Sequence, residues 1–258
     1  MSETEPILAR QEKSVLIVTI NRAFARNAVD RDAAKALYDT FKAFDADEAL
    51  SVAILTGADG NFCAGADLKA VTQGKGNPVR ADGDMGPMGP SRLELSKPVI
   101  AAVEGYAVAG GLELALWCDL RVVSETGRFG VFCRRFGVPL IDGGTIRLPR
   151  LIGASRAMDM ILTGREVAPD EALSIGLANY VAPAGGALDR ALQLANDIAA
   201  FPQTCMRADR LSAMRQWSLD IPTALKVEVE GGMAVLKSGE TVRGATAFTQ
   251  GKGRHGKF

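Results

Sequence analysis

Two glycine-rich segments carry the residues of this chain that could do chemistry. Residues 55–69 (LTGADGNFCAGADLK) and 104–119 (EGYAVAGGLELALWCD) each begin where a run typical of a buried strand ends. In the second segment a turn of small residues leads into a helix that we predict to begin at Gly110, and the unpaired N–H groups at a helix N-terminus can stabilise an oxyanion. Glu113 follows almost one turn later, so its carboxylate and the Gly110 N–H can face the same point. This spacing predicts an oxyanion donor beside a general acid or base.

A structural interpretation of the same residues stays open, because a first-turn acid complements the helix dipole and glycines permit close packing. Other catalytic patterns are absent: the sequence has no G-x-x-x-x-G-K-[ST], no G-x-G-x-x-G after a strand and no G-x-S-x-G. The single histidine, His255, lies three residues from the C-terminus, which excludes a Ser-His-Asp triad and a multi-histidine metal site. Carboxylates, cysteines or backbone dipoles must therefore do any chemistry, and we expect no metal.

The elements that must position these residues indicate an α/β protein. Runs rich in β-branched residues at 14–20 and 52–56 flank an amphipathic helix, for which Asp30 is the expected N-cap. Strand, helix and strand over about forty residues form a βα unit. Further short strands are predicted at 98–103 and 119–123.

The second half of the chain has a different pattern. From about residue 143 the spacing favours helices without strands, apart from a short extended exit after the second helix. We therefore predict a core at 1–200 and a helical C-terminal region at 201–258. The segment 73–92 lacks periodicity and is dense in Gly, Pro and charge, which predicts either a mobile loop beside a binding site or a tolerated surface insertion. The helices are expected at 156–163, 169–175, 187–201, 204–217 and 221–237.

Composition limits the class of protein. Thirty basic and thirty acidic residues give a net charge of zero, which argues against nucleic acid or an anionic membrane as partner. The four cysteines show no C-x-x-C spacing, so a disulfide scaffold or zinc site is not expected. The N-terminal residues are charged and lack an apolar stretch, so we expect no secretory leader and a cytoplasmic protein.

Several motifs, in this order, resemble the crotonase (enoyl-CoA hydratase/isomerase) superfamily. The match runs from about residue 14 to the C-terminus. The resemblance implies an α/β fold, a crotonase-like spiral of ββα units with a helical C-terminal region that mediates trimerisation, often as a dimer of trimers. The motifs are NRAFARNAVD (21–30), GNFCAGADLK (60–69), KPVIAAVEGYAVAGGLELALWCDLRV (97–122), GRFG (127–130), GGTIRLPRLIG (143–153) and LTGREVAPDEALSIGLANYV (162–181).

By motif match, the resemblance also implies a site. The thioester carbonyl of an acyl-CoA would lie between the backbone N–H groups of Ala66 and Gly110, which would stabilise an enolate. Glu113 would be the main acid or base. Coenzyme A would enter only as part of the substrate, without a separate cofactor. The residues expected to contact it are Ala64, Asp67 and Leu68 in the adenine and pantetheine pocket, and Arg22 and Lys69 near the phosphates; Arg22 has the alternative of a solvated basic residue.

The sequence departs from the resemblance at one catalytic position. Hydratases of the family use two glutamates, and Cys133 occupies the position of the second. Asp142 is the nearest replacement, although it could instead cap the helix predicted after it. Cys133 could be a thiolate activated by the arginines that follow it, or a small buried apolar residue.

Three hypotheses follow. The first is an enoyl-CoA hydratase/isomerase that stabilises a thioester enolate, with Glu113 as acid or base. The second is an enoyl- or dienoyl-CoA isomerase that uses Glu113 and Asp142, because Cys133 replaces the second hydratase glutamate. The third, from another class, is a non-catalytic acyl-CoA-binding protein.

Overall fold

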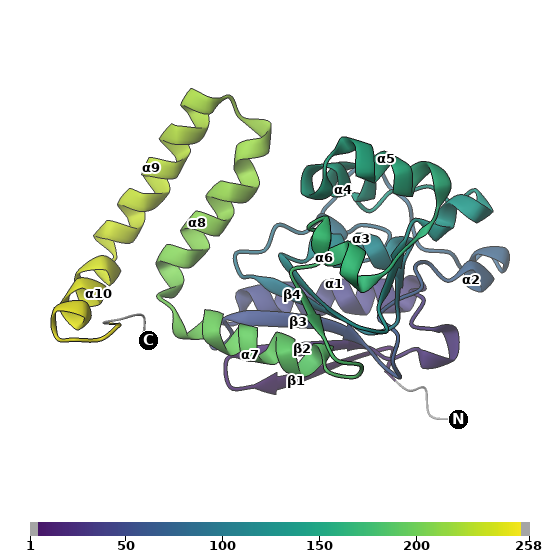
Figure 1. Ribbon diagram of the computed structural model, residues 1–258, viewed down its shortest axis with the longest axis horizontal. Coiled ribbons are helices and arrows are strands. Elements are labelled where there is room, and N and C mark those ends of the chain that lie inside the picture. Colours follow the sequence, from purple (N-terminus) through teal and green to yellow (C-terminus); the bar gives the residue numbers. More distant parts are fainter. Residues whose placement is uncertain (1–4, 254–258) are drawn as a thin grey trace.

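A six-stranded sheet forms the centre of the molecule (Figure 1). The computed structural model describes residues 5–253. The strand order is β1-β2-β3-β4-β6-β9, in which β1 runs antiparallel to β2 and every other neighbouring pair is parallel. The strands are β1 (Ile7–Glu12), β2 (Val15–Ile20), β3 (Val52–Gly57), β4 (Val99–Val103), β6 (Leu120–Ser124) and β9 (Tyr180–Ala182).

Both faces of this sheet are buried, as the near-continuous apolar sequences of its parallel strands require. One face packs against α7 (Ala187–Ala200), through a cluster that includes Ile17, Ile54 and Leu194. The alternate residues of the same strands face α1 (Arg31–Ala46) and α3 (Gly110–Trp117). The core thus lies in two layers on either side of the sheet.

A second, smaller sheet lies between strands of the main sheet and the helices that follow them in the chain. It contains β5 (Tyr106–Val108), β7 (Arg128–Gly130) and β8 (Glu166–Val167), in the order β5-β7-β8. An isolated bridge between Cys63 and Ala107 extends it toward β3. The chain therefore repeats one path: a strand of the main sheet, a short segment of the small sheet, then a helix. The three helices reached in this way are α2 (Leu68–Thr72), α3 and α4 (Gly144–Ile152).

The C-terminal helices leave this body. The path from α4 continues through α5 (Ala154–Thr163), α6 (Pro169–Ser174) and α7. The expectation that only helices follow residue 143 is wrong for β8 (Glu166–Val167), because a two-residue strand is too short to show periodicity. The predicted extended exit forms β9, which pairs with β6. An arm then projects from the body, made of α8 (Gln203–Arg215), α9 (Ile221–Lys237) and α10 (Glu240–Thr249) (Figure 1). No helix among residues 5–253 is long and apolar enough to span a membrane.

The segment 73–92 has two different halves. Residues 73–84 are largely exposed, whereas Gly86–Ser91 are buried, and Pro90–Arg92 form a short 3-10 helix. Gly86 and Gly89 exchange backbone hydrogen bonds and close a tight turn within the buried half. The second half is therefore an ordered wall of the interior rather than a surface insertion.

Candidate active site

The cavity that most of the expected site residues line opens where the two glycine-rich segments meet. Its volume is about 540 Å³, and most of its lining is apolar. The only carboxyl groups lining it, among the described residues, are those of Glu113 and Asp142. The segment 76–88 contributes one wall, which confirms that the loop lies beside a pocket. The remaining walls include Ala64, Ala66, Leu68, Val71, Gly110, Phe132, Cys133, Phe136, Val138 and Ile141.

Backbone pairing brings these segments together. The Cys63 N–H donates to Tyr106 O at 2.8 Å, and the Val108 N–H donates to Cys63 O at 3.1 Å. A side chain at Gly111 would overlap the Cys63 carbonyl, so only glycine lets α3 begin against this strand. The sequence motif around Gly111 is therefore a consequence of close backbone approach.

The two expected oxyanion donors lie next to each other. Gly65 has a φ of +98°, and a Cβ there would lie 3.0 Å from the Gly110 nitrogen. The Val29 backbone makes hydrogen bonds with Gly65 and Asp67, the two neighbours of Ala66. Successive residues of an extended chain face opposite sides, so the Ala66 N–H points away from Val29. Within residues 5–253, neither the Ala66 N–H nor the Gly110 N–H donates to a protein acceptor. Both residues line the cavity, so both donors are available to a ligand there.

Glu113 is buried and held from outside its own helix. It is 2% exposed, and its Oε1 accepts from the N–H of Asp142 at 2.9 Å and of Gly144 at 2.8 Å. Burial raises its pKa to about 7, with the nearby Asp142 carboxylate acting in the same direction and the two N–H donors opposing. A carboxyl group with such a pKa can accept or donate a proton near neutrality. Among the described residues, the hydrogen bonds of its carboxylate come from residues 142–144, so the segment that leads into α4 holds this side chain.

Asp142 is the second buried carboxyl group of the cavity. It is 4% exposed, and its Oδ1 accepts from the Met88 N–H at 2.9 Å and from the Ser91 hydroxyl. Burial raises its pKa, while these two hydrogen bonds oppose the shift. The capping alternative is wrong, because Gly143 is the N-cap of α4 and no side chain caps that helix.

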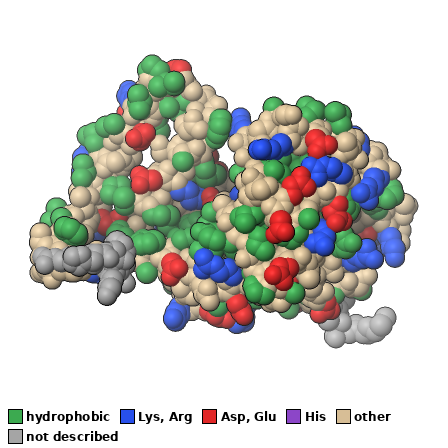
Figure 2. Space-filling model, viewed as in Figure 1, with side chains coloured by type: hydrophobic (Ala, Val, Ile, Leu, Met, Phe, Trp, Pro, Cys, Tyr) green, Lys and Arg blue, Asp and Glu red, His purple; other side chains and the backbone are tan. Residues whose placement is uncertain are grey.

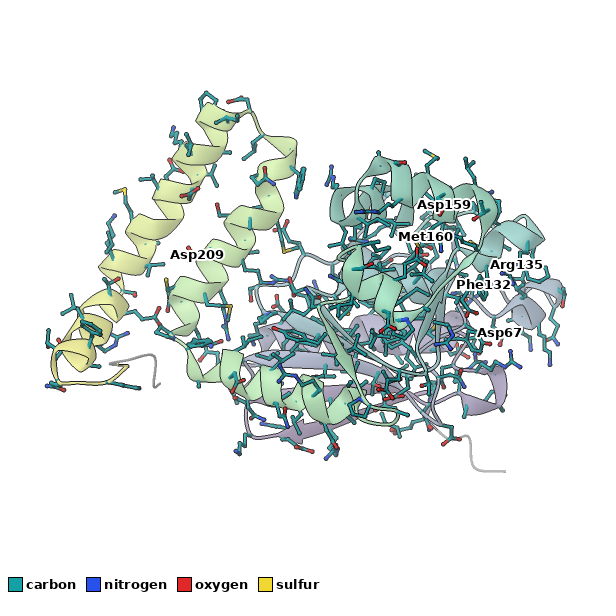
Figure 3. The ribbon with its side chains drawn as sticks, in the orientation of Figure 1. Asp67, Phe132, Arg135, Asp159, Met160 and Asp209 are labelled. Atoms are coloured by element: carbon teal, nitrogen blue, oxygen red, sulfur yellow. The ribbon has the colours of Figure 1, made fainter. Side chains whose placement is uncertain are left out.

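Cys133 lies in the same cavity but is not activated. Burial raises the pKa of its thiol, and Glu113 raises it further, so the neutral thiol is favoured. The arginines that follow it are engaged elsewhere: Arg134 donates to Ile161 O at 3.0 Å, and Arg135 donates to Gly164 O at 2.9 Å. Arg135 also lies over the Phe132 ring (Figure 3). This supports the small buried residue rather than the thiolate.

The residues expected near coenzyme A fall into two groups. Ala64 and Leu68 line the cavity, whereas Arg22, Asp67 and Lys69 do not. Arg22 is only 8% exposed and pairs with Asp67 at 3.1 Å, and also with the α1 cap Asp30, which rules out the solvated alternative.

Asp67 (Figure 3) in turn caps α2 by accepting from the N–H groups of Lys69 and Ala70. Lys69 is exposed, and no ion pair of its side chain occurs within the described range. The pair Arg22–Asp67 thus fixes the start of α2, while the Lys69 ammonium group remains available at the surface.

Sequence reasoning missed the residues that hold Asp142 and those that close the cavity. Ser91 and Met88 lie more than 50 positions from Asp142, and no motif marks their contact. Phe132 and Phe136, on either side of Cys133, show no periodic pattern in the sequence. His255 lies outside the described residues.

The comparisons with known proteins agree with this geometry. Residues 10–254 match the family model described as enoyl-CoA hydratase/isomerase. The chain is 36% identical over 250 residues to the enoyl-CoA hydratase EchA19 of Mycobacterium tuberculosis, covering 94% of this chain and 93% of that relative. It is 34% identical to the 2,3-dehydroadipyl-CoA hydratase of Escherichia coli, covering 96% of both. The crystal structure of enoyl-CoA hydratase EchA1 from Mycobacterium marinum superposes with a TM-score of 0.90 at 37% identity, covering 96% of each chain.

The fold and these relatives define an enzyme of the crotonase fold, which confirms the expected fold class. The chain belongs to the enoyl-CoA hydratase/isomerase family. Its trimeric assembly and the roles of its individual site residues stay predictions.

Proposed function

We propose that this enzyme adds water to the double bond of a 2-enoyl-CoA through a thioester enolate. The observation that carries the proposal is the meeting, in one mostly apolar cavity, of two unpaired backbone donors and two buried carboxyl groups. The N–H groups of Ala66 and Gly110 would bind the thioester oxygen, where negative charge develops in the transition state. Donors of this kind contribute about 3–4 kcal/mol each when they are fixed before the reaction.

The two carboxyl groups would divide the proton transfers. Ionised Glu113 would take a proton from water while the water oxygen bonds to C3 of the substrate. The electron pair of the double bond would then move to the thioester oxygen. Protonated Asp142 would then give its proton to C2, so that one water is added in total. Burial raises the pKa of both groups, and that of Glu113 to about 7, so Glu113 can change its protonation state near neutral pH.

The proposed coenzyme A contacts divide in the same way. Ala64 and Leu68 would line the path of the pantetheine chain into the cavity. Lys69 would meet the phosphates, while Arg22 would act indirectly by holding Asp67 and the start of α2. This assigns the phosphate contact to an exposed cation rather than to a buried one already paired with two carboxylates.

Product analysis on a panel of 2-enoyl-CoA thioesters tests the proposal. Hydration gives a 3-hydroxyacyl-CoA heavier by one water, which mass spectrometry detects. We expect Glu113→Gln to lower kcat by about 10²- to 10⁴-fold, the usual contribution of a positioned acid or base. The matched control is Cys133→Ala, which changes a neighbouring cavity residue and is expected to leave kcat within about twofold. Undiminished hydration by Glu113→Gln would contradict the assignment.

A second candidate, double-bond isomerisation, is favoured by Cys133. Its neutral thiol lies near Glu113 where a second hydratase glutamate is expected, so one proton donor of hydration is missing there. In isomerisation a carboxylate would remove a proton from C2 of a 3-enoyl-CoA and the acid formed would return it to C4. A product of unchanged mass with a shifted double bond, without a hydroxylated product, would select this candidate.

A further inference from the structure

The buried half of the loop segment reaches the second carboxyl group. Ser91 is 1% exposed, and its hydroxyl donates to Oδ1 of Asp142, the same oxygen that accepts from the Met88 N–H at 2.9 Å. Within residues 5–253, Oδ2 of Asp142 makes no hydrogen bond. One carboxylate oxygen is therefore fully engaged, and the other is left for a ligand in the cavity that Asp142 lines.

A second set of bonds fixes the backbones that carry this pair. The Arg147 guanidinium donates to Asp142 O at 2.9 Å and to Ser91 O at 2.7 Å, and so ties α4 to the segment 86–92. Gly86 leaves no free space beside the hydroxyl, because a Cβ there would overlap Ser91 Oγ and lie 2.8 Å from Asp142 Oδ1. The Ser91 hydroxyl is thus confined to the position from which it meets Asp142.

We propose that Ser91 is a positioning residue, whose hydroxyl, together with the Met88 N–H, holds Oδ1 of Asp142 so that Oδ2 is the atom that exchanges a proton with the substrate. The inference rests on the proposed function, in which Asp142 is the second proton carrier. It adds that the loop segment 86–92, and not α4 alone, sets the geometry of that carboxyl group. Outer partners of this kind commonly matter because a small displacement of a catalytic group costs a large factor in rate.

The charged and titratable surroundings of Asp142 predict how its titration responds. Glu113 faces it from α3, Arg147 from α4 and Arg92 from the 3-10 helix at 90–92. The Ser91 hydrogen bond stabilises the ionised form against burial, so its removal raises the pKa of Asp142 further. The limb of the kcat pH profile that belongs to Asp142 therefore moves to higher pH when the hydroxyl is lost.

Steady-state kinetics of the full chain on a trans-2-enoyl-CoA test this. We expect Ser91→Ala to lower kcat about 10- to 100-fold with KM within about threefold, and to shift the pH profile as stated. The matched control is Ser96→Ala, which removes the same kind of bond, Ser96 Oγ to Asp45 Oδ1 at 2.8 Å, away from the cavity. It is expected to leave kcat and the pH profile unchanged. Gly86→Ala displaces the Ser91 hydroxyl without removing it, and is expected to change kcat in the same direction as Ser91→Ala.

A double-mutant cycle separates positioning from any independent effect. In an Asp142→Asn background, Ser91→Ala is expected to cause no further loss of kcat. An equal loss in both backgrounds, or a kcat for Ser91→Ala equal to that of Ser96→Ala, would overturn the inference. If Ser91→Ala does not fold, as judged by its thermal unfolding, Gly86→Ala takes its place in the same cycle.

The cycle also distinguishes this inference from the proposed function. A large loss of kcat in Asp142→Asn without a loss in Ser91→Ala overturns only the positioning role. A kcat unchanged by Asp142→Asn removes Asp142 as proton carrier and the inference with it. The Glu113→Gln result remains the separate test of the enolate chemistry.

Discussion

Glu113 and Asp142 are coupled through a single backbone bond. The N–H of Asp142 donates to Glu113 Oε1, while the Asp142 carboxyl group is held from the other side by the loop segment. Each group is desolvated, and the Asp142 carboxylate also raises the pKa of Glu113, which titrates near neutral pH. Burial of these carboxyl groups lowers the stability of the fold, but it also raises their pKa toward the range in which they can transfer protons.

The burial of Glu113 makes the free energy of unfolding depend on pH, and this dependence can be measured. The pKa of Glu113 is raised from 4.5 to about 7 on folding, so the folded state holds a proton that the unfolded state releases between these values. The free energy of unfolding therefore falls as the pH rises through this interval. We expect Glu113→Gln, which keeps an oxygen acceptor but no charge, to be more stable than the natural protein at pH 8 by up to about 3 kcal/mol.

Chemical denaturation at pH 5 and pH 8 measures this difference. The advantage of Glu113→Gln is expected to be small at pH 5 and to grow toward pH 8. Glu228→Gln, which changes an exposed residue of α9, is the control and is expected to show no such growth. An equal difference at both pH values would mean that Glu113 is not desolvated as described.

The element that organises the site is the N-terminus of α3. Its first turn begins from Ala109, which has a φ of 54° and a ψ of −126°, a conformation that side chains disfavour. The turn is held because the Cys63 backbone pairs with β5 immediately before it. The strained turn thus places Gly110 at the cavity wall, where its N–H has no protein acceptor among the described residues.

Replacing Gly111 tests this arrangement. Gly111→Ala would place a Cβ against the Cys63 carbonyl, which is backbone and cannot rotate away. We expect a loss of about 2–3 kcal/mol in the free energy of unfolding from overpacking, together with a loss of kcat because the two donors move apart. Gly244→Ala in α10, where a Cβ meets nothing within 4 Å, is expected to be neutral or to stabilise by up to about 1 kcal/mol. Equal stabilities of the two variants, by denaturant titration, would refute the close approach.

At the scale of the whole molecule, the arm formed by α8, α9 and α10 exposes large apolar side chains to solvent in a single copy of the chain. Large apolar residues recur on α9 at intervals of three or four, which places them on one face, and all are exposed: Ile221, Leu225, Val229, Met233 and Leu236. Figure 2 shows hydrophobic side chains along this arm. A continuous exposed apolar stripe of this kind marks an interaction surface. It supports the expected assembly of the chain with further copies of itself.

A charge placed on this stripe is expected to break that assembly. Val229, 59% exposed, is the central residue of the stripe. We expect the natural chain to have the mass of a trimer or a dimer of trimers by light scattering, and Val229→Lys to shift it toward a monomer. Glu230→Gln, the adjacent position with the same change in net charge, is expected to keep the mass of the natural chain. A natural chain that is monomeric at micromolar concentration would contradict the expectation.

The local elements and the donors of the site could be predicted from the sequence, because their signals are local. Strands 14–20 and 52–56 and the helix capped by Asp30 follow from periodicity and capping over a few residues, and the structure places them there. The turn at Gly110 was visible for the same reason. The order of strands in the sheet and the pairing of Cys63 with β5 were not, since they depend on contacts between distant segments.

The tertiary structure alone decided the state of the titratable groups. Chain composition predicted that backbone donors and carboxylates, rather than histidine, must do the chemistry. It left open whether Asp142 is a cap, whether Cys133 is a thiolate and whether Arg22 is solvated. Each answer depends on burial and on partners that are distant in the sequence, such as Ser91 for Asp142 and Asp67 for Arg22. A pKa is set by the surroundings in space, and only the folded chain brings those surroundings together.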